Sequence, residues 1–209
     1  MKKTITALQA QKKNPDRISV FLDDEFAFGL YHIVAAQLRI GQQLETEEIQ
    51  QLRQAEAGEK AYQRALNFLS YRVRTEIEIR RNLAKHDTPE DVVEDVLERL
   101  RRNRFVDDAY FAQTWVENRS DFRPRGRRAL HSELRQKGIA DEIIQETLLD
   151  LDEQALALRA AEKNARKYRR LEWPEFRKKL LGFLARRGFN YDVSAPAVEQ
   201  AWARMQDEA

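Results

Sequence analysis

A segment of about 50 residues occurs three times along the chain, and this repetition limits the possible folds more than any other feature. Three leucines mark equivalent positions, and an aliphatic residue follows each of them nine positions later: Leu83 with Val92, Leu134 with Ile143, and Leu184 with Val193. Self-similarity at a fixed period is the signature of repeat architectures. Each segment also contains stretches with the apolar spacing of helices. We therefore expect a mainly α-helical fold with tandem three-helix repeats over residues 57–104, 105–152 and 153–209.

Residues 1–56 lie outside the repeat and have a different pattern. Apolar residues alternate in segments 18–22 and 26–30, and three acidic residues separate the two segments. Alternation broken by a short polar turn predicts a β-hairpin. Residues 4–9 predict a third strand, joined to the hairpin through the turn signal Asn14-Pro15-Asp16. Helical segments at 31–38 and at 47–53, the latter capped by Thr46, are expected to cover one face of this three-stranded meander.

Capping residues define two helix starts in the repeats. Thr88 is expected to cap the helix that continues to Leu100, with Pro89 at its first position. Asp107 has the position of an N-cap for the next helix, and Asp108 then lies in the first turn, where the helix dipole favours a negative charge. This carboxylate pair also invites a metal or acid–base interpretation, but capping accounts for both residues. Two of the three tryptophans, at positions 115 and 202, follow apolar stripes and are expected in the core.

Composition excludes several classes of protein. The 209 residues are 42% hydrophobic and 34% charged and include no cysteine, so we expect a packed core without disulfides, thiol chemistry or cysteine-based zinc sites. No apolar run approaches the roughly 18 residues that a membrane helix needs, and no secretory signal is visible. We therefore expect a soluble cytoplasmic protein. Since phosphate-binding glycine loops and histidine metal motifs are also missing, we expect no enzyme, no cofactor and no metal.

Basic residues are concentrated in two segments, although the net charge is only +2. Segment 119–128 has five arginines and one aspartate, and segment 159–187 has eleven lysines and arginines and three glutamates. Such clusters can follow a phosphate backbone or an acidic protein groove, or can simply be solvated helix surface. Both interpretations remain open for the second segment. The arginines between 123 and 128 are expected to face solvent and to contact a partner.

The chain resembles the RecX family of bacterial regulators over roughly residues 57–205. The matching pieces are Arg72-Val73-Arg74-Thr75 with Glu78-Ile79 and Leu83, then Phe105-Val106-Asp107-Asp108 with Tyr110, Ala112 and Arg119, and then the run from Glu133 to Ile139. Their order and spacing on a repeat of about 50 residues carry the resemblance. Thr75 stands where the family often has serine, and Ala129 stands where some members carry a basic residue.

The resemblance implies a regulator that is not an enzyme. Such proteins bind the RecA–DNA filament and inhibit the ATP hydrolysis, strand exchange and SOS coprotease activity of RecA. Among the matched positions, Asp107 and Gly138 are interpreted as helix caps and Tyr110 as a packing residue, which leaves Arg119 and Lys137 as contact residues. With the arginines and lysines added by charge, the expected partner or DNA contacts are Arg119, Arg123, Arg125, Arg127, Arg128, Lys137, Arg166, Lys167 and Arg170.

We expect this protein to be a monomer that binds the RecA filament, with DNA bound weakly or within the filament, and that has no membrane partner. Two other functions are compatible with the residues. Three-helix units can resemble helix-turn-helix modules, which would make the chain an independent DNA-binding regulator. A helical-repeat scaffold for peptides would need no DNA at all.

Overall fold

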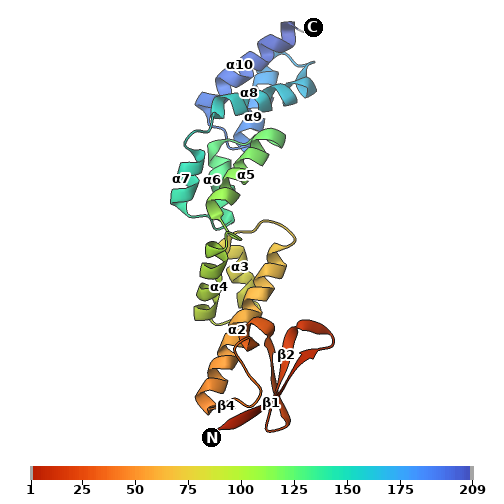
Figure 1. Ribbon diagram of the computed structural model, residues 1–209. Helices are drawn as coiled ribbons and strands as arrows, with labels where there is room; N and C mark the ends of the chain where they lie inside the picture. Colours follow the sequence, from red (N-terminus) through yellow and green to blue (C-terminus); the bar gives the residue numbers. More distant parts are fainter. Residues whose placement is uncertain (1, 208–209) are drawn as a thin grey trace. The chain divides into compact units, whose positions relative to one another are not determined.

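The computed structural model describes residues 2–207, which divide into two compact units. The first unit contains the described residues up to Val73 together with Ile79–Phe105. The second contains Arg74–Glu78 together with the described residues from Val106 onward. The predicted fold class, mainly helical with an N-terminal strand meander, is confirmed (Figure 1).

An antiparallel sheet in the strand order β3-β2-β1-β4 begins the first unit. Its strands are β1 (Lys3–Gln11), β2 (Asn14–Leu22), β3 (Glu25–Tyr31) and β4 (Gln43–Leu44). The predicted hairpin is β2–β3, and Asp23 and Asp24 at its turn have φ values of 51° and 65°, as a type I′ turn requires. The turn between β1 and β2 lies at residues 12–13, so the prediction that placed it at Asn14–Asp16 is wrong by two residues. Strand β4 has only two residues, too few to show alternation.

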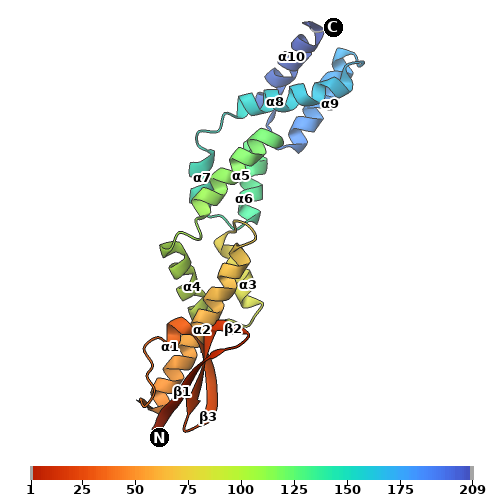
Figure 2. The same cartoon turned by 45° about the vertical axis from the view of Figure 1, so that its right-hand side comes forward.

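Helix α2 (Thr46–Leu69) packs against the sheet, and Figure 2 shows it beside the strands. The core between them contains Ile5, Val20, Leu22, Leu30 and Leu44, with Ile49 and Leu52 of α2 packed against it. Helix α1 (His32–Ala35) is a single turn, much shorter than the helix expected over residues 31–38. The N-cap of α2 is Glu45, which forms a capping box with Glu48, so Thr46 is the first helical residue and not the cap.

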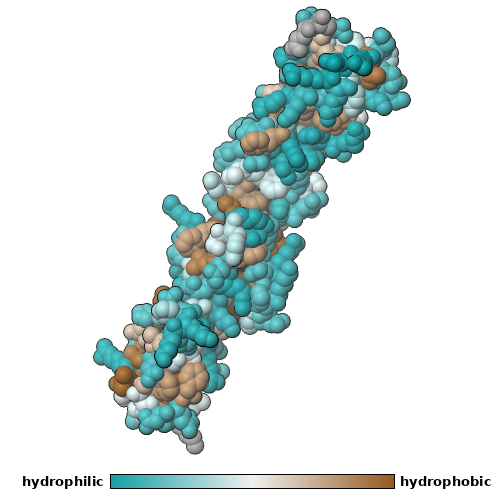
Figure 3. Space-filling view, turned by 90° about the vertical axis from the view of Figure 1, so that its right-hand side faces the viewer, coloured by the Kyte–Doolittle hydropathy of each residue, from teal (hydrophilic) through white to brown (hydrophobic). Residues whose placement is uncertain are grey.

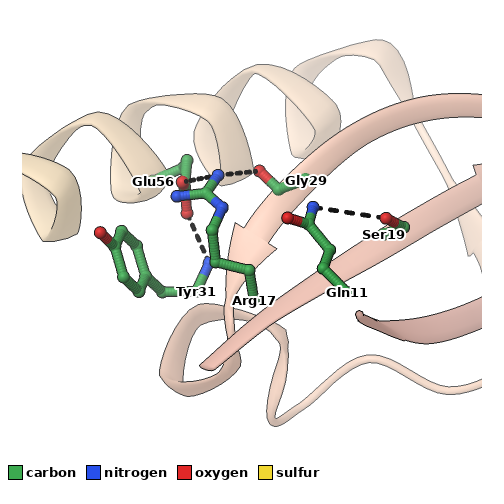
Figure 4. Close-up of polar contacts among 6 residues, drawn as sticks. All are labelled: Gln11, Arg17, Ser19, Gly29, Tyr31 and Glu56. Carbon is green, nitrogen blue, oxygen red and sulfur yellow. Dashed lines mark hydrogen bonds and ion pairs between the residues drawn. The ribbon is translucent and has the colours of Figure 1, made fainter. Parts of the chain in front are cut away.

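Glu56 joins helix α2 to the sheet (Figure 4). Its carboxylate accepts hydrogen bonds from Arg17 Nη2 at 2.6 Å and from the backbone N of Tyr31 at 2.6 Å. Arg17 also donates to the carbonyl of Gly29 at 3.2 Å, and its guanidinium lies 4.7 Å from the centre of the Tyr31 ring. The two charged side chains are only 23% and 14% exposed, so this ion pair is shielded from solvent far more than an ordinary surface pair.

Helix α2 continues without a break through residues 56 and 57, where we expect the boundary between the N-terminal extension and the first repeat. The sheet and the first helix group therefore share one helix. Helices α3 (Glu76–Ala84) and α4 (Glu90–Arg102) complete this group. The N-cap of α4 is Pro89, one residue after the expected Thr88. The apolar side chains Val93, Val96, Leu97 and Leu100 of α4 are buried.

Six helices and a 3-10 turn, in two further groups of three helices, make up the rest of the described chain. The first group is α5 (Asp108–Phe122), α6 (Arg127–Gln136) and α7 (Asp141–Leu148). The second is α8 (Glu153–Ala165), the 3-10 turn η1 (Arg166–Tyr168), α9 (Trp173–Arg186) and α10 (Tyr191–Asp207). Each group has its own core, with Leu134 fully buried in the first and Leu184 fully buried in the second.

The start of α5 confirms one prediction and corrects another. Asp107 is the N-cap, and its carboxylate accepts a hydrogen bond from the backbone N of Tyr110 at 2.9 Å. The Tyr110 side chain is 58% exposed, so the packing role expected for it is wrong. It lies on the outward face of the helix, because the next two residues, Phe111 and Ala112, occupy the core face. Trp115 and Trp202 pack against the two cores, as predicted.

The sequence repeat also appears in the backbone. Asp87, Gly138 and Gly188 each follow a repeat leucine by four residues, and all three have positive φ values, of 55°, 81° and 86°. A residue with positive φ commonly ends a helix, and glycine takes this conformation at the lowest cost. The prediction that Gly138 ends a helix is therefore confirmed.

Two equivalent junctions lie within the second unit, which includes the start of α3 (residues 74–78). Thr75 Oγ1 donates to the carbonyl of Lys137 at 2.8 Å, and the backbone N of Gly126 donates to the carbonyl of Arg187 at 2.9 Å. Thr75 and Gly126 both stand eight residues before a repeat leucine, and the two carbonyls both stand three residues after one. In the first junction, the residue before α3 bonds to the end of α6. In the second, the N-cap of α6 bonds to the end of α9 in the equivalent way.

The surface shown in Figure 3 is mainly hydrophilic, with hydrophobic areas in separate places. Isolated exposed apolar side chains are normal on soluble domains, and only those beside a charged cluster need an explanation. Phe122, at the end of α5, is 68% exposed and lies beside such a cluster. Within residues 2–207, no helix combines the length and the apolar character needed to cross a membrane.

Candidate nucleic-acid interface

Nine basic residues are predicted to contact a partner, and the structure separates them into two sets. Four have specific partners inside the protein: Arg119, Arg125, Arg127 and Lys137. The other five are exposed: Arg123, Arg128, Arg166, Lys167 and Arg170. For the side chains of these five, the described part of the chain supplies neither an ion pair nor a hydrogen bond. The internal set stabilises the fold, and the exposed set remains available for a partner.

Glu133 of α6 is the acidic partner of two of the internal arginines, Arg119 and Arg125. Arg119 Nε donates to Glu133 Oε2 at 2.8 Å, and the Arg119 guanidinium lies 4.4 Å from the centre of the Trp115 ring. Trp115 Nε1 donates to the same carboxylate oxygen at 2.9 Å. Arg125 Nε is 3.2 Å from Glu133 Oε1, but its N–H is not aligned for a hydrogen bond. Arg119 thus holds α5 against α6.

Arg127 is only partly exposed and bonds inside the protein, which contradicts the expected exposure of the whole 123–128 cluster. Its side chain donates to the carbonyls of Leu148 and Leu151, and its backbone N donates to Glu153 Oε1 at 2.8 Å. The last carbonyls of a helix have no partner within the helix, and a cation there also complements the helix dipole. Arg127 therefore caps the end of α7, a contact between residues more than 20 positions apart that no local pattern reveals.

Lys137 is part of the first of the two junctions within the second unit. Its Nζ lies 3.3 Å from Glu78 Oε1 and 5.3 Å from the centre of the Trp115 ring. Its carbonyl accepts the hydrogen bond from Thr75. Lys137 and Thr75 both belong to the segments that resemble the RecX family, and they contact each other. Both residues therefore have a structural role.

Two of the exposed residues, Arg123 and Lys167, lie in one groove with two further cations, Lys163 and Arg187. We call this cavity of about 290 Å³ the basic groove. Its walls come from the end of α5 and from α8, η1 and α9. The remaining lining residues are Phe122, Pro124, Ala160, Asn164 and Phe183. The lining thus contains four cationic side chains and no carboxylate.

Arg187 shows the electrostatic cost of this arrangement. Burial lowers the pKa of its guanidinium below the usual value, and the nearby charges of Arg125 and Arg123 lower this pKa further. Arg187 is held in place nevertheless, because Nη1 donates to the carbonyl of Pro124 at 3.3 Å and the guanidinium lies 4.8 Å from the centre of the Phe183 ring. An anion in the groove would relieve the repulsion among these fixed cations.

Sequence reasoning included Lys163 and Arg187 in the basic segment 159–187 but did not select them as contact residues. Lys163 and Lys167 are four residues apart, which places them on one helical face. This four-residue spacing is the sequence signal that could have identified the two lysines of the groove. Arg123 and Arg187 lie 64 positions apart in the sequence, and only the folded chain brings them to the same groove. No cluster of three or more possible metal ligands occurs among the described residues.

Three-helix groups in tandem, with a basic groove on the second unit, define a helical-repeat protein with a cationic groove on its surface. Comparison with known proteins identifies the family. The N-terminal domain of regulatory protein RecX matches residues 3–45. The first, second and third three-helix domains of RecX match residues 61–100, 107–148 and 152–198.

Relatives with this name are similar along nearly the whole chain. Regulatory protein RecX of Bacillus velezensis is 36% identical over 98% of this chain and 80% of its own length. That of Bacillus subtilis is 33% identical over 94% and 76%. A crystal structure of regulatory protein RecX superimposes with a TM-score of 0.79 at 32% identity, over 91% of this chain and 96% of the other. RecX from Lactobacillus salivarius gives 0.65 at 27% identity, over 70% and 97%.

The chain belongs to the RecX family of regulatory proteins. This result confirms the resemblance that the repeat residues indicate.

Proposed function

We propose that this protein is a negative modulator of the RecA recombinase. It binds the RecA–DNA filament and inhibits the ATPase, strand-exchange and coprotease activities of RecA, and it thereby acts in recombination, DNA repair and the SOS response in the cytoplasm. Membership of the RecX family, whose members carry the name of regulatory proteins, supports this role. The protein acts by binding, without catalysis and without a cofactor.

The basic groove is the observation that carries the proposal. Four cations around one cavity repel each other, so a partner that supplies negative charge gains affinity there. DNA phosphates are the densest source of negative charge in a RecA–DNA filament. Of the nine predicted contact residues we retain the five that are exposed, of which Arg123 and Lys167 line the groove, and we add the groove residues Lys163 and Arg187.

Inhibition follows from mass action. A protein that binds one state of the filament more tightly than another shifts the equilibrium toward that state by the difference in affinity. Neither the junctions nor the cores need to change shape for this effect. The protein needs only a surface that fits one filament state, and a basic groove on a repeat scaffold provides one.

The test is the single-stranded-DNA-dependent ATPase of RecA from the same source, titrated with this protein. We expect the wild type to inhibit, and the double variant Lys163→Gln/Lys167→Gln to need at least about ten times more protein, because two charged contacts are lost. The matched control is Lys178→Gln/Lys179→Gln, which removes the same charge from exposed positions on α9 outside the groove. Equal inhibition by both double variants would contradict the role of the groove.

Stoichiometry separates two modes of action in the same titration. Inhibition well below one copy per RecA indicates capping of filament ends or strongly cooperative disassembly, and inhibition only near saturation indicates occupancy of the filament groove.

A second candidate function also follows from the basic groove: an independent DNA-binding regulator. It predicts tight, salt-sensitive binding to bare DNA without inhibition of RecA. That pair of results would replace the RecA proposal.

A further inference from the structure

An exposed aromatic ring stands at the basic groove. Phe122 is the last residue of α5, lines the groove and is 68% exposed. A phenylalanine with this much exposed surface gains free energy when a flat apolar surface covers it. Its position next to Arg123 combines an uncovered ring with a cation. Cations that follow a backbone, together with aromatic rings that stack on bases, are the components of single-stranded nucleic-acid sites.

The cations also continue beyond the basic groove. A second groove, between α8 and α10, is lined by Arg159, Lys163, Arg166 and Arg204, with Glu162 as its one acidic residue. Glu162 forms an ion pair with Arg204. Lys163 lines both grooves, so positive charge extends around α8 from one groove to the other. A single small anion would occupy only one of these grooves, whereas a linear polyanion can use both.

We propose that the basic groove binds one strand of single-stranded nucleic acid, with a base stacked on Phe122 and with Arg123, Lys163 and Lys167 on the phosphates. This inference rests on the proposed function, because it names the ligand class of the same groove. A double helix fits less well, since its bases are stacked on each other and offer no free face to Phe122. An acidic peptide would neutralise the cations but would leave the ring without a stacking partner.

The test is binding of fluorescein-labelled dT20 to the full chain without RecA, measured by anisotropy over a range of salt concentrations. An abasic oligomer of the same length serves as a second ligand with the same phosphates and no bases. We expect dT20 to bind at least about five times more tightly than the abasic oligomer. Phe122→Leu should remove this preference and leave affinity for the abasic oligomer unchanged. Phe105→Leu, at another exposed phenylalanine, is the matched control and should change neither affinity.

The lysines are tested in the same assay. Lys163→Gln/Lys167→Gln should weaken binding of both oligomers and lower the slope of log affinity against log salt by about 1.4, or about 0.7 for each phosphate contact. Lys178→Gln/Lys179→Gln should keep the wild-type slope. Equal affinity of the wild type for both oligomers would overturn the stacking assignment. Equal losses in the two double variants would overturn the assignment of the groove.

The RecA titration separates this inference from the proposed function. If Phe122→Leu loses the preference for dT20 while the wild type fails to inhibit RecA, the nucleic-acid site stands and the RecA proposal fails. If the wild type inhibits RecA but neither double variant nor Phe122→Leu alters dT20 binding, the RecA proposal stands and the single-strand site fails.

Discussion

Replacement of Gly126 by alanine should weaken the junction between α6 and the end of α9. A Cβ atom at Gly126 would lie 2.4 Å from the backbone C and O of Gly188 and 2.5 Å from the backbone N of Phe189. All three are backbone atoms, so no side-chain rotation can relieve the clash. The φ of Gly126 is −75°, which alanine adopts readily, so the whole cost comes from close packing and none from an unfavourable backbone angle.

The magnitude follows from two contributions. Adding a methyl group to a tightly packed site costs about 1–3 kcal/mol. The backbone hydrogen bond from Gly126 to Arg187, 2.9 Å long, is stretched when the two segments separate, which costs about a further 0.5–1.5 kcal/mol. The expected loss of unfolding free energy is therefore about 1.5–4.5 kcal/mol.

Tryptophan emission during urea unfolding is the appropriate assay. The three tryptophans, at positions 115, 173 and 202, all lie in the second unit, so their emission follows that unit. With a urea dependence of about 2 kcal/mol per molar, the midpoint should fall by about 0.8–2.2 M. The control is Gly58→Ala, inside α2, where an added Cβ meets nothing within 4 Å. It should stabilise the first unit by about 0.5–1 kcal/mol, detected by circular dichroism, and should leave the tryptophan transition unchanged.

An unchanged tryptophan midpoint for Gly126→Ala would refute the close approach of the two backbones. A fall of the same size in Gly58→Ala would show that the tryptophan signal does not report on the second unit alone. The first result would require a different packing of the α6–α9 junction, and the second would require another probe of the second unit.

Three further changes test the internal contacts. Leu134→Ala removes a fully buried side chain and should lower stability by about 2–5 kcal/mol; an unchanged melting temperature would show that the repeat leucines are not core residues. Arg127→Ala should lower stability by about 1–3 kcal/mol, seen in the urea midpoint, while the affinity for dT20 changes little; the opposite pattern would return Arg127 to the binding surface. Glu133→Ala removes the acceptor of Arg119 and of the Trp115 indole, so stability should fall by about 1–2 kcal/mol and tryptophan emission should shift to longer wavelength; wild-type emission would contradict the Trp115 contact.

Much of the fold could be predicted from the chain because local patterns control it. The repeat leucines predicted buried positions, and Leu83, Leu134 and Leu184 are all fully buried. Asp107 predicted a helix start, because an N-cap depends only on the next few residues. A helix start was predicted one residue too early where two neighbouring residues can each occupy the N-cap position, as at Thr88 and Pro89. The domain boundaries at 56/57, 104/105 and 152/153 stay a prediction, and the first of them lies within α2.

The candidate site could be predicted only in part. Composition identified two basic segments, and four of the predicted contact residues proved to have partners inside the fold. Arg123 and Arg127 stand four positions apart in the same segment. One lines an exposed groove, and the other caps a helix that ends more than 20 residues later.

Local sequence is sufficient for the long helices, the repeat and the buried leucines, since these depend on spacing along one element. The role of each arginine depends on which carbonyl or carboxylate another element brings near it, and that is a property of the packed chain. The basic groove has the same origin. It exists because α5, α8 and α9 bring together cations up to 64 positions apart, and no periodicity in the sequence encodes that distance.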